Sequence, residues 1–93
     1  MLFAWIGLLK PGVDSIPQDV QQQANDFLQQ PYIRIAAMGQ LRDGDGKRVG
    51  MMMLFEVDDR AKAEAFVANS PFLKAGLYDR YHLVEYDLEV GDI

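Results

Sequence analysis

The chain has 93 residues, a mass of 10.5 kDa, no cysteine, and a formal charge of −5 from nine Lys and Arg against fourteen Asp and Glu. One hydrophobic core suits this length, so we expect a single domain over residues 1–93. The lack of cysteine excludes disulfides and thiolate chemistry, and the negative charge argues against a nucleic-acid partner. The longest apolar run, Leu2–Leu9, is too short to span a bilayer and lacks the flanks of a secretory signal. We therefore expect a cytoplasmic protein with no membrane partner.

The first part of the chain predicts a strand followed by a helix. Met1–Lys10 is apolar and contains aromatic and β-branched residues that favour a strand. Ser15 can serve as the N-cap of a helix, with Gln18 as its N3 partner and Pro17 in the first turn. Pro31 ends this helix. Its apolar stripe consists of Ile16, Val20, Ala24, Phe27 and Leu28.

Two strands joined by a turn follow and predict a hairpin. Tyr32–Leu41 is the first strand, and Val49–Val57 is the second. Arg42–Lys47, which contains two Asp-Gly pairs, supplies the turn. By simple alternation, one side of the first strand carries Ile33, Ile35, Ala37, Gly39 and Leu41.

The last third of the chain predicts a helix, a compact turn and a final strand. Arg60–Ala68 is rich in alanine, and Asp58 or Asp59 can cap it. Phe72–Asp79 is typical of a compact turn. Tyr81–Val90 alternates between apolar and polar residues and is the predicted last strand.

The order β-α-β-β-α-β is typical of the α+β, ferredoxin-like fold. Right-handed crossovers then give a four-stranded antiparallel sheet with both helices on one face. Met1–Leu9 and Gly50–Phe55, however, are apolar at consecutive positions and would present apolar side chains on both faces of the sheet. Because the helices cover only one face, we expect a homodimer in which two sheets pack face to face.

Three motifs that could carry other chemistry do not have the residue types that it needs. Asp43–Gly46 resembles the start of a calcium loop, but Leu41 and Met52 would stand at its first and last ligand positions. Arg48–Phe55 lacks the stacking rings of an RNA-recognition strand. Neighbouring side chains of Met51–Met53 point to opposite faces, which does not suit a soft-metal site. We expect no metal, and the lack of a glycine-rich phosphate loop predicts no nucleotide cofactor.

Three polar residues are candidates for a site. His82 is the only histidine, and histidine is the side chain that ordinarily titrates near neutrality. Arg34 lies among apolar residues and could hold an anionic ligand through two hydrogen bonds, or form a salt bridge at the surface or in a dimer interface. Ser70 precedes Pro71 with no histidine beside it in sequence, which by itself is typical of a residue that ends a helix.

The segment Ala68–Tyr78 resembles a motif of the YciI-like (YCII-related) family. At this point the family carries Asp-Pro-Phe/Tyr and, a few residues later, Ala-Gly-Leu/Val-Tyr/Phe. The chain has Ser70-Pro71-Phe72 and Ala75-Gly76-Leu77-Tyr78. The small-Gly segment Met38–Leu41, the Asp-Gly turn and the Ala-rich helix agree as well, so the resemblance covers nearly the whole chain.

This resemblance implies a ferredoxin-like domain that dimerises as an α/β barrel, similar to muconolactone isomerases, with a pocket between sheet and helices. Members of the family usually pair a histidine on the first helix with the aspartate of Asp-Pro, a combination suited to acid–base chemistry. This chain has Gln21–Gln23 and Ser70 at the corresponding points. Glutamine cannot exchange a proton near neutrality, and serine without a base is a poor nucleophile.

Two hypotheses follow, and the sequence leaves open whether the protein is an enzyme. The preferred one is a catalytically silent dimer that binds a small molecule or another protein through the cavity. Its ligand-binding candidates are Gln22, Arg34, Ser70, Phe72 and Tyr78. The alternative is an isomerase- or lyase-like enzyme for small metabolites, with Ser70 and His82 as catalytic candidates. The position of His82 separates them, because this histidine could serve as a base beside Ser70 or Tyr78 in a pocket but not on the outer side of the sheet edge.

Overall fold

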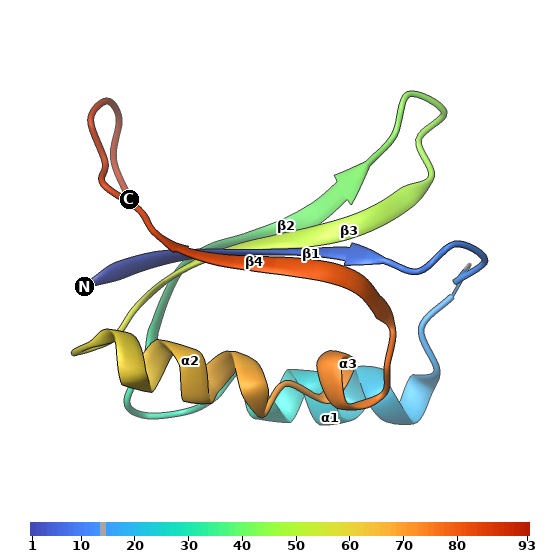
Figure 1. The fold of residues 1–93 in the computed structure, drawn as a ribbon, viewed down its shortest axis with the longest axis horizontal. Coiled ribbons are helices and arrows are strands. Elements are labelled where there is room, and N and C mark those ends of the chain that lie inside the picture. Colours follow the sequence, from blue (N-terminus) through green and yellow to red (C-terminus); the bar gives the residue numbers. More distant parts are fainter. Residues whose placement is uncertain (14) are drawn as a thin grey trace.

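A four-stranded antiparallel sheet with helices on one face makes up the computed structural model, which describes residues 1–13 and 15–93. The sheet order is β2-β3-β1-β4, and the helices lie below the sheet in Figure 1. This arrangement confirms the α+β, ferredoxin-like prediction. No helix in the described part of the chain is long and apolar enough to cross a membrane. In chain order the elements are β1 (Leu2–Leu9), α1 (Gln18–Phe27), β2 (Arg34–Arg42), β3 (Arg48–Glu56), α2 (Arg60–Ala68), α3 (Pro71–Lys74) and β4 (Tyr78–Glu85).

The first helix, α1, begins later than predicted. Its N-cap residue is Pro17, which has an extended backbone with φ −54° and ψ 138°, and the side chain at the cap makes no hydrogen bond. Ser15 as the cap would require helical backbone angles at Ile16, but a residue before proline is biased away from them. The prediction of a capping box from Ser15 to Gln18 is therefore wrong.

The segment after α2 also differs from the prediction. Pro71–Lys74 forms the short helix α3 instead of an irregular turn, and Gly76 then reverses the chain with φ +71°. β4 starts and ends earlier than the predicted strand Tyr81–Val90. It is an edge strand that pairs only with β1, and its last residue, Glu85, lies opposite Phe3 near the start of β1. β1 extends only one residue further, to Leu2, so little of the partner strand remains beyond Glu85.

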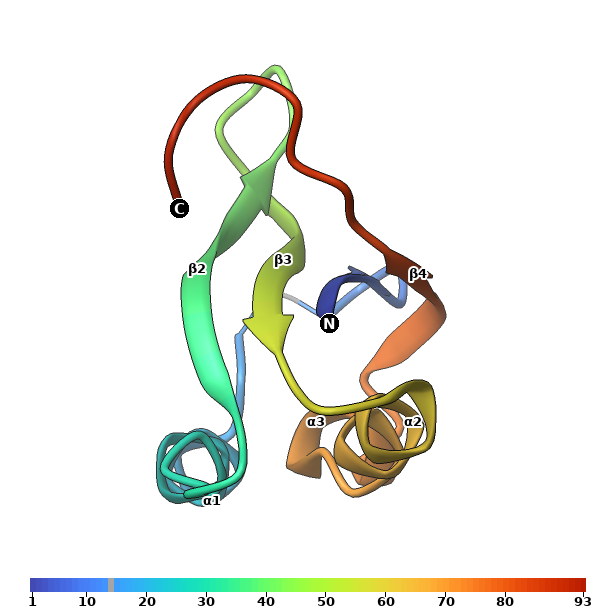
Figure 2. The ribbon, with the colours of Figure 1, turned by 90° about the vertical axis from the view of Figure 1, so that its left-hand side faces the viewer.

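The core lies between the sheet and the helices and is rich in aromatic rings. Phe66 of α2 stacks on Phe27 of α1 with 4.7 Å between ring centroids, and Trp5 meets Phe66 edge-on at 6.1 Å. These contacts join both helices to the sheet, with α1 under one side and α2 and α3 under the other (Figure 2). The buried core consists of Phe3, Trp5, Met51, Met53, Phe55, Val57, Ala63, Phe66, Val67, Phe72 and Tyr78.

Three irregularities interrupt the strand pairing of the described sheet. Each places one extra residue opposite two consecutive residues of the neighbouring strand: Ala36 in β2, Val49 in β3 and Asp79 in β4. Such a bulge resets the alternation of side chains. Ile35 packs on the core, for example, whereas Ala37 pairs with a residue on the outer face of the sheet. The prediction that these two residues share one side of the strand is therefore wrong.

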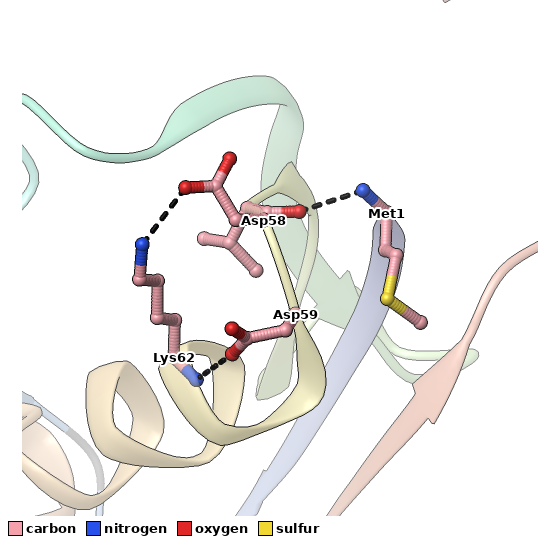
Figure 3. A network of polar contacts seen from close by, with 5 residues as sticks. Met1, Asp58, Asp59 and Lys62 are labelled. Atoms are coloured by element: carbon pink, nitrogen blue, oxygen red, sulfur yellow. Dashed lines mark hydrogen bonds and ion pairs between the residues drawn. The ribbon is translucent and has the colours of Figure 1, made fainter.

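The start of α2 is held by a small polar network (Figure 3). Asp59, one of the two predicted caps, accepts a hydrogen bond of 2.8 Å from the backbone N–H of Lys62. The Lys62 ammonium group donates to Asp58 at 2.8 Å, and this hydrogen bond lowers the pKa of Asp58 and raises that of Lys62. The amino group of Met1 donates to the carbonyl of Val57 at 2.6 Å, which joins the start of β1 to the same loop.

The face of the sheet away from the helices carries the apolar side chains that the sequence predicted for it. Met52 and Val84 are exposed on this outer face, and Ile6 and Leu8 are partly exposed. Residues 86–93 leave β4 on the same side of the sheet in both views (Figures 1 and 2). The exposed apolar residues of this segment are Tyr86, Leu88, Val90 and Ile93.

Candidate functional site

A pocket lies between the inner face of the sheet and helices α1 and α3, with a cavity volume of about 50 Å³. Met38 is half exposed and Gln21 is partly buried, so these two side chains lie where the pocket meets solvent. The apolar walls are formed by Ala24, Phe27, Leu28, Met51, Met53 and Phe72. The polar groups belong to Trp5, Gln21, Arg48, Ser70 and Tyr78.

The bulges determine which side chains reach this pocket. Met38, Arg48 and Tyr78 each lie within two residues of a bulge and line the pocket. Strict alternation from Met51 would put Arg48 on the outer face, and alternation from His82 would do the same for Tyr78. The extra residues turn both side chains toward the helices instead, a common role of bulges beside binding sites.

Tyr78 lies against β1 because Gly7 has no side chain. A Cβ atom at Gly7 would be only 2.6 Å from a ring carbon of Tyr78. The ring is 6.1 Å from Trp5 and 6.0 Å from Phe72, measured between centroids. Any larger residue at Gly7 would displace the ring, so this glycine sets the position of Tyr78 in the pocket.

The phenol of Tyr78 remains neutral at physiological pH. Burial raises the pKa of Tyr78 to about 12, while the positive charge of Arg48 acts in the opposite direction. A phenol in this state can donate a hydrogen bond but cannot serve as a base near neutrality.

Ser70 is the buried N-cap residue of α3, with 4% of its surface exposed. Its backbone N–H donates to the carbonyl of Val67 at 3.1 Å, and its carbonyl accepts from the backbone N–H of Lys74 at 3.0 Å. Its hydroxyl makes no capping hydrogen bond. No histidine, aspartate or glutamate among the described residues lines the pocket with it. Without a base, this hydroxyl is suited to hydrogen bonding and not to nucleophilic attack.

Two buried donors of the pocket residues lack a partner in the part of the chain that the structure describes. Trp5 is 2% exposed, and within residues 1–13 and 15–93 its indole Nε1–H finds no acceptor; the same is true of the Nε–H of Arg48. The Arg48 guanidinium lies over the ring of Phe72, 5.8 Å from its centroid. Indole and guanidinium groups only donate hydrogen bonds. The pocket therefore combines apolar walls with donors and one positive charge.

Three of the candidates from the sequence meet in this pocket, namely Ser70, Phe72 and Tyr78. Gln22 does not line it. The side-chain amide of Gln22 lies on the exposed side of α1 and donates to Asp26 at 3.2 Å.

Arg34 and His82 lie elsewhere. Arg34 is exposed and pairs with Glu56 at 3.5 Å, which is the salt bridge that the sequence left as its alternative role. His82 is exposed on the edge strand β4 and pairs with Ile6 on the outer face of the sheet. The only histidine and the buried Ser70 therefore lie on opposite sides of the sheet.

Sequence reasoning did not identify Trp5, Gln21 and Arg48 as pocket residues. Trp5 has the appearance of an ordinary core residue in an apolar strand. Arg48 was hidden by the bulge at Val49, since strict alternation places it away from Met51. One signal was available: Arg48 is a charged residue directly before the apolar run Val49–Phe55.

Known proteins share this fold. The chain is similar to a 5-chloro-2-hydroxyhydroquinone dehydrochlorinase from Burkholderia phenoliruptrix AC1100, solved in complex with 2,5-dihydroxybenzoquinone, with 23% identity, a TM-score of 0.79 and 94% of each chain covered. It is also similar to an antibiotic biosynthesis monooxygenase, with 19% identity, a TM-score of 0.56, and 97% of this chain and 100% of that chain covered. No curated protein matches the chain.

At these identities the two structures support the fold alone. The YCII-related domain, in contrast, matches residues 1–87, which include every strand and helix described above and all of the pocket residues. This match confirms the resemblance that the sequence carries at Ser70–Phe72 and Ala75–Tyr78. The chain therefore belongs to the YCII-related domain family.

Proposed function

We propose that this protein binds a small metabolite with a single flat ring in the pocket and does not perform the proton transfer to which the family's His-Asp pair is suited. The polar groups of the pocket carry this proposal. The indole of Trp5, the guanidinium of Arg48 and the phenol of Tyr78 can donate hydrogen bonds, and none of them takes up a proton near neutrality. Binding is therefore the activity that the geometry favours.

A flat ring suits the walls of the pocket. Phe27 and Phe72 offer aromatic surfaces for stacking or edge-on contacts. The similar dehydrochlorinase was solved with 2,5-dihydroxybenzoquinone, a single ring with oxygen substituents, which guides the choice of test compounds. The cavity of about 50 Å³ is smaller than the roughly 150 Å³ that holds benzene, so Met38 at the mouth must move when a ring enters.

The intrinsic fluorescence of the protein tests this proposal, because Trp5 is the only tryptophan and lines the pocket. We expect one-ring hydroxyquinones or aromatic acids to change the emission in a saturable way and to raise Tm. The variant Ala24→Phe fills the pocket from α1 and should abolish both effects. Ala61→Phe, on the exposed side of α2, is the matched control. Binding that survives in Ala24→Phe, or no response to any one-ring compound, would contradict the proposal.

The enzymatic alternative is favoured by the likeness to a dehydrochlorinase. It needs a proton acceptor in the pocket, and His82 lies on the other side of the sheet from Ser70. A chloride-release assay with a chlorinated hydroxyhydroquinone separates the two functions. Binding alone leaves release at the uncatalysed rate, whereas accelerated release that disappears in Ser70→Ala would favour the enzyme.

We also propose that two copies of the chain pack through their outer sheet faces. Met52 and Val84 are 38% and 50% exposed there, and Ile6 and Leu8 extend the same apolar surface across β1. A second copy is the simplest occupant of such a surface, since twofold symmetric dimers are the commonest oligomers. The apolar side chains of residues 86–93 lie on the same side and would add to the interface.

A further inference from the structure

We infer that the pocket selects ligands whose flat ring carries an anionic oxygen, and that Arg48 determines this preference. The inference rests on the proposed function, since it names the class of compound that the same pocket would bind. It covers aromatic carboxylates and the ionised oxygens of hydroxyquinones, which share a negatively charged acceptor at the edge of a ring.

The first argument is the unpartnered donors. The Nε1–H of Trp5 and the Nε–H of Arg48 are buried, and neither finds an acceptor among the residues that the structure describes. A buried donor without a partner is unfavourable, and a ligand that supplies an acceptor removes this cost. A ligand oxygen can accept a hydrogen bond from such a donor, whereas a ligand that offers only N–H groups cannot.

The second argument is charge. Arg34 pairs with Glu56 and Lys62 pairs with Asp58, both at the protein surface. Arg48 is partly buried, and over the described chain no carboxylate forms a salt bridge with it. Its guanidinium lies over the Phe72 ring, at the wall of the pocket. An anionic oxygen would therefore meet a positive charge with which no acidic side chain of the described residues forms a salt bridge, in surroundings where such a pair is screened less than in water.

The third argument is the bulge at Val49, which orients the side chain of Arg48 toward the pocket. The bulge at Val49 breaks the alternation of β3 just where the strand begins and turns Arg48 inward, the one charged side chain among the described residues that line the pocket. Ser70 and Tyr78 line the same pocket, and their hydroxyls are of the kind that can donate further hydrogen bonds to the oxygen. Because the cavity is small, the oxygen would enter first and the ring would extend toward Met38 at the mouth.

Isothermal titration calorimetry with three probes tests the inference: benzoate, benzamide and benzylammonium, which share one ring and differ in charge. We expect benzoate to bind at least about tenfold more tightly than benzamide, and benzylammonium not to bind. In Arg48→Gln the affinity for benzoate should fall by about tenfold, while that for benzamide stays within about twofold. Arg34→Gln is the matched control and should leave all three affinities unchanged, because Arg34 lies outside the pocket.

The outcomes separate this inference from the proposed function. If benzamide binds as tightly as benzoate, or if Arg48→Gln retains the preference for benzoate, one-ring binding stands and the role of Arg48 is overturned. If none of the probes nor 2,5-dihydroxybenzoquinone binds, the proposed function fails and the inference with it. If Arg48→Gln does not fold, the ratio of benzoate to benzamide affinity in the unmodified protein tests the preference for an anionic oxygen. Arg48→Lys, which keeps the positive charge, should preserve that preference, and its loss in a folded Arg48→Lys would contradict the role of the charge.

Discussion

At the scale of single residues, Tyr78 both lines the pocket and affects the stability of the fold. Its ring occupies the space left by Gly7 and contacts Trp5 and Phe72, so the hydroxyl is held in partly desolvated surroundings beside Arg48. Burial disfavours the phenolate, and it is this effect that raises the pKa. The same side chain therefore supplies a donor to the pocket and carries a measurable dependence of stability on pH.

Tyr78→Phe should remove that pH dependence. The phenol has a pKa of about 12 in the folded protein against an ordinary value of 10.0, so between these values the folded state binds more protons than the unfolded state. The contribution is complete below pH 10 and is lost as the pH rises toward 12, by up to roughly 3 kcal/mol. In urea unfolding, the free energy of unfolding of Tyr78→Phe should rise relative to that of the unmodified protein as the pH increases across this window.

The matched control for this measurement is Tyr81→Phe, at an exposed position of the same strand. Its stability relative to the unmodified protein should not change with pH in the same window. Equal slopes for Tyr78→Phe and the unmodified protein would contradict the burial of the Tyr78 hydroxyl.

At the scale of the elements, bulges and caps explain where the sequence patterns succeed and where they fail. α2 begins where predicted, because Asp59 caps it through a local hydrogen bond that needs no distant residue. α1 begins at Gln18 and not next to Ser15, because Pro17 disfavours helical angles at the residue before it. Both helix starts depend on residues that are close together in the chain. The start of α1 could have been predicted from Pro17 alone.

Asp59→Ala should destabilise the protein by about 1 kcal/mol through loss of the α2 cap. Asp58→Ala is the matched control, since it removes only the exposed contact to Lys62 and should have a smaller effect. Because the pKa of Asp58 is lowered, the contribution of this contact is present above pH 3.8 and is lost as the pH falls through the lower folded value. Urea unfolding of both variants would measure the difference, and equal losses would contradict the assignment of Asp59 as the cap.

The bulges act over a longer range than the caps. The three extra residues Ala36, Val49 and Asp79 can be located only by pairing each strand with its neighbour. Nothing in the residue types of β3 alone marks Val49 as unpaired. The bulges turn Arg48 and Tyr78 inward. These two side chains supply the positive charge and a hydroxyl donor of the pocket.

At the scale of the whole molecule, the uncovered outer face of the sheet is the basis of the proposed dimer. A sheet with one face on the helices and an apolar second face has more apolar surface than one chain can bury. The pocket lies on the opposite, helix-covered face, so in the proposed dimer it stays clear of the interface.

Sedimentation equilibrium tests the proposed dimer, with an expected mass of about twice 10.5 kDa at micromolar concentration. Met52→Glu places a charge on the outer face and should shift the mass toward that of one chain. Tyr32→Glu, an exposed aromatic residue that precedes β2, is the control and should remain dimeric. A single-chain mass for the unmodified protein would overturn the proposal.

The sequence by itself determined the β-α-β-β-α-β order, the family and the apolar character of both sheet faces. These properties depend on composition, on local periodicity and on a contiguous motif, Ser70–Tyr78, all of which are carried by residues near one another in the chain. The resemblance also implied that Gln21–Gln23 and Ser70 stand where family members usually carry a histidine and an aspartate. Only the tertiary structure decided which side chains share the pocket, because that depends on strand register. It placed Arg48 and Trp5 with Ser70 and Tyr78, and His82 on the other face.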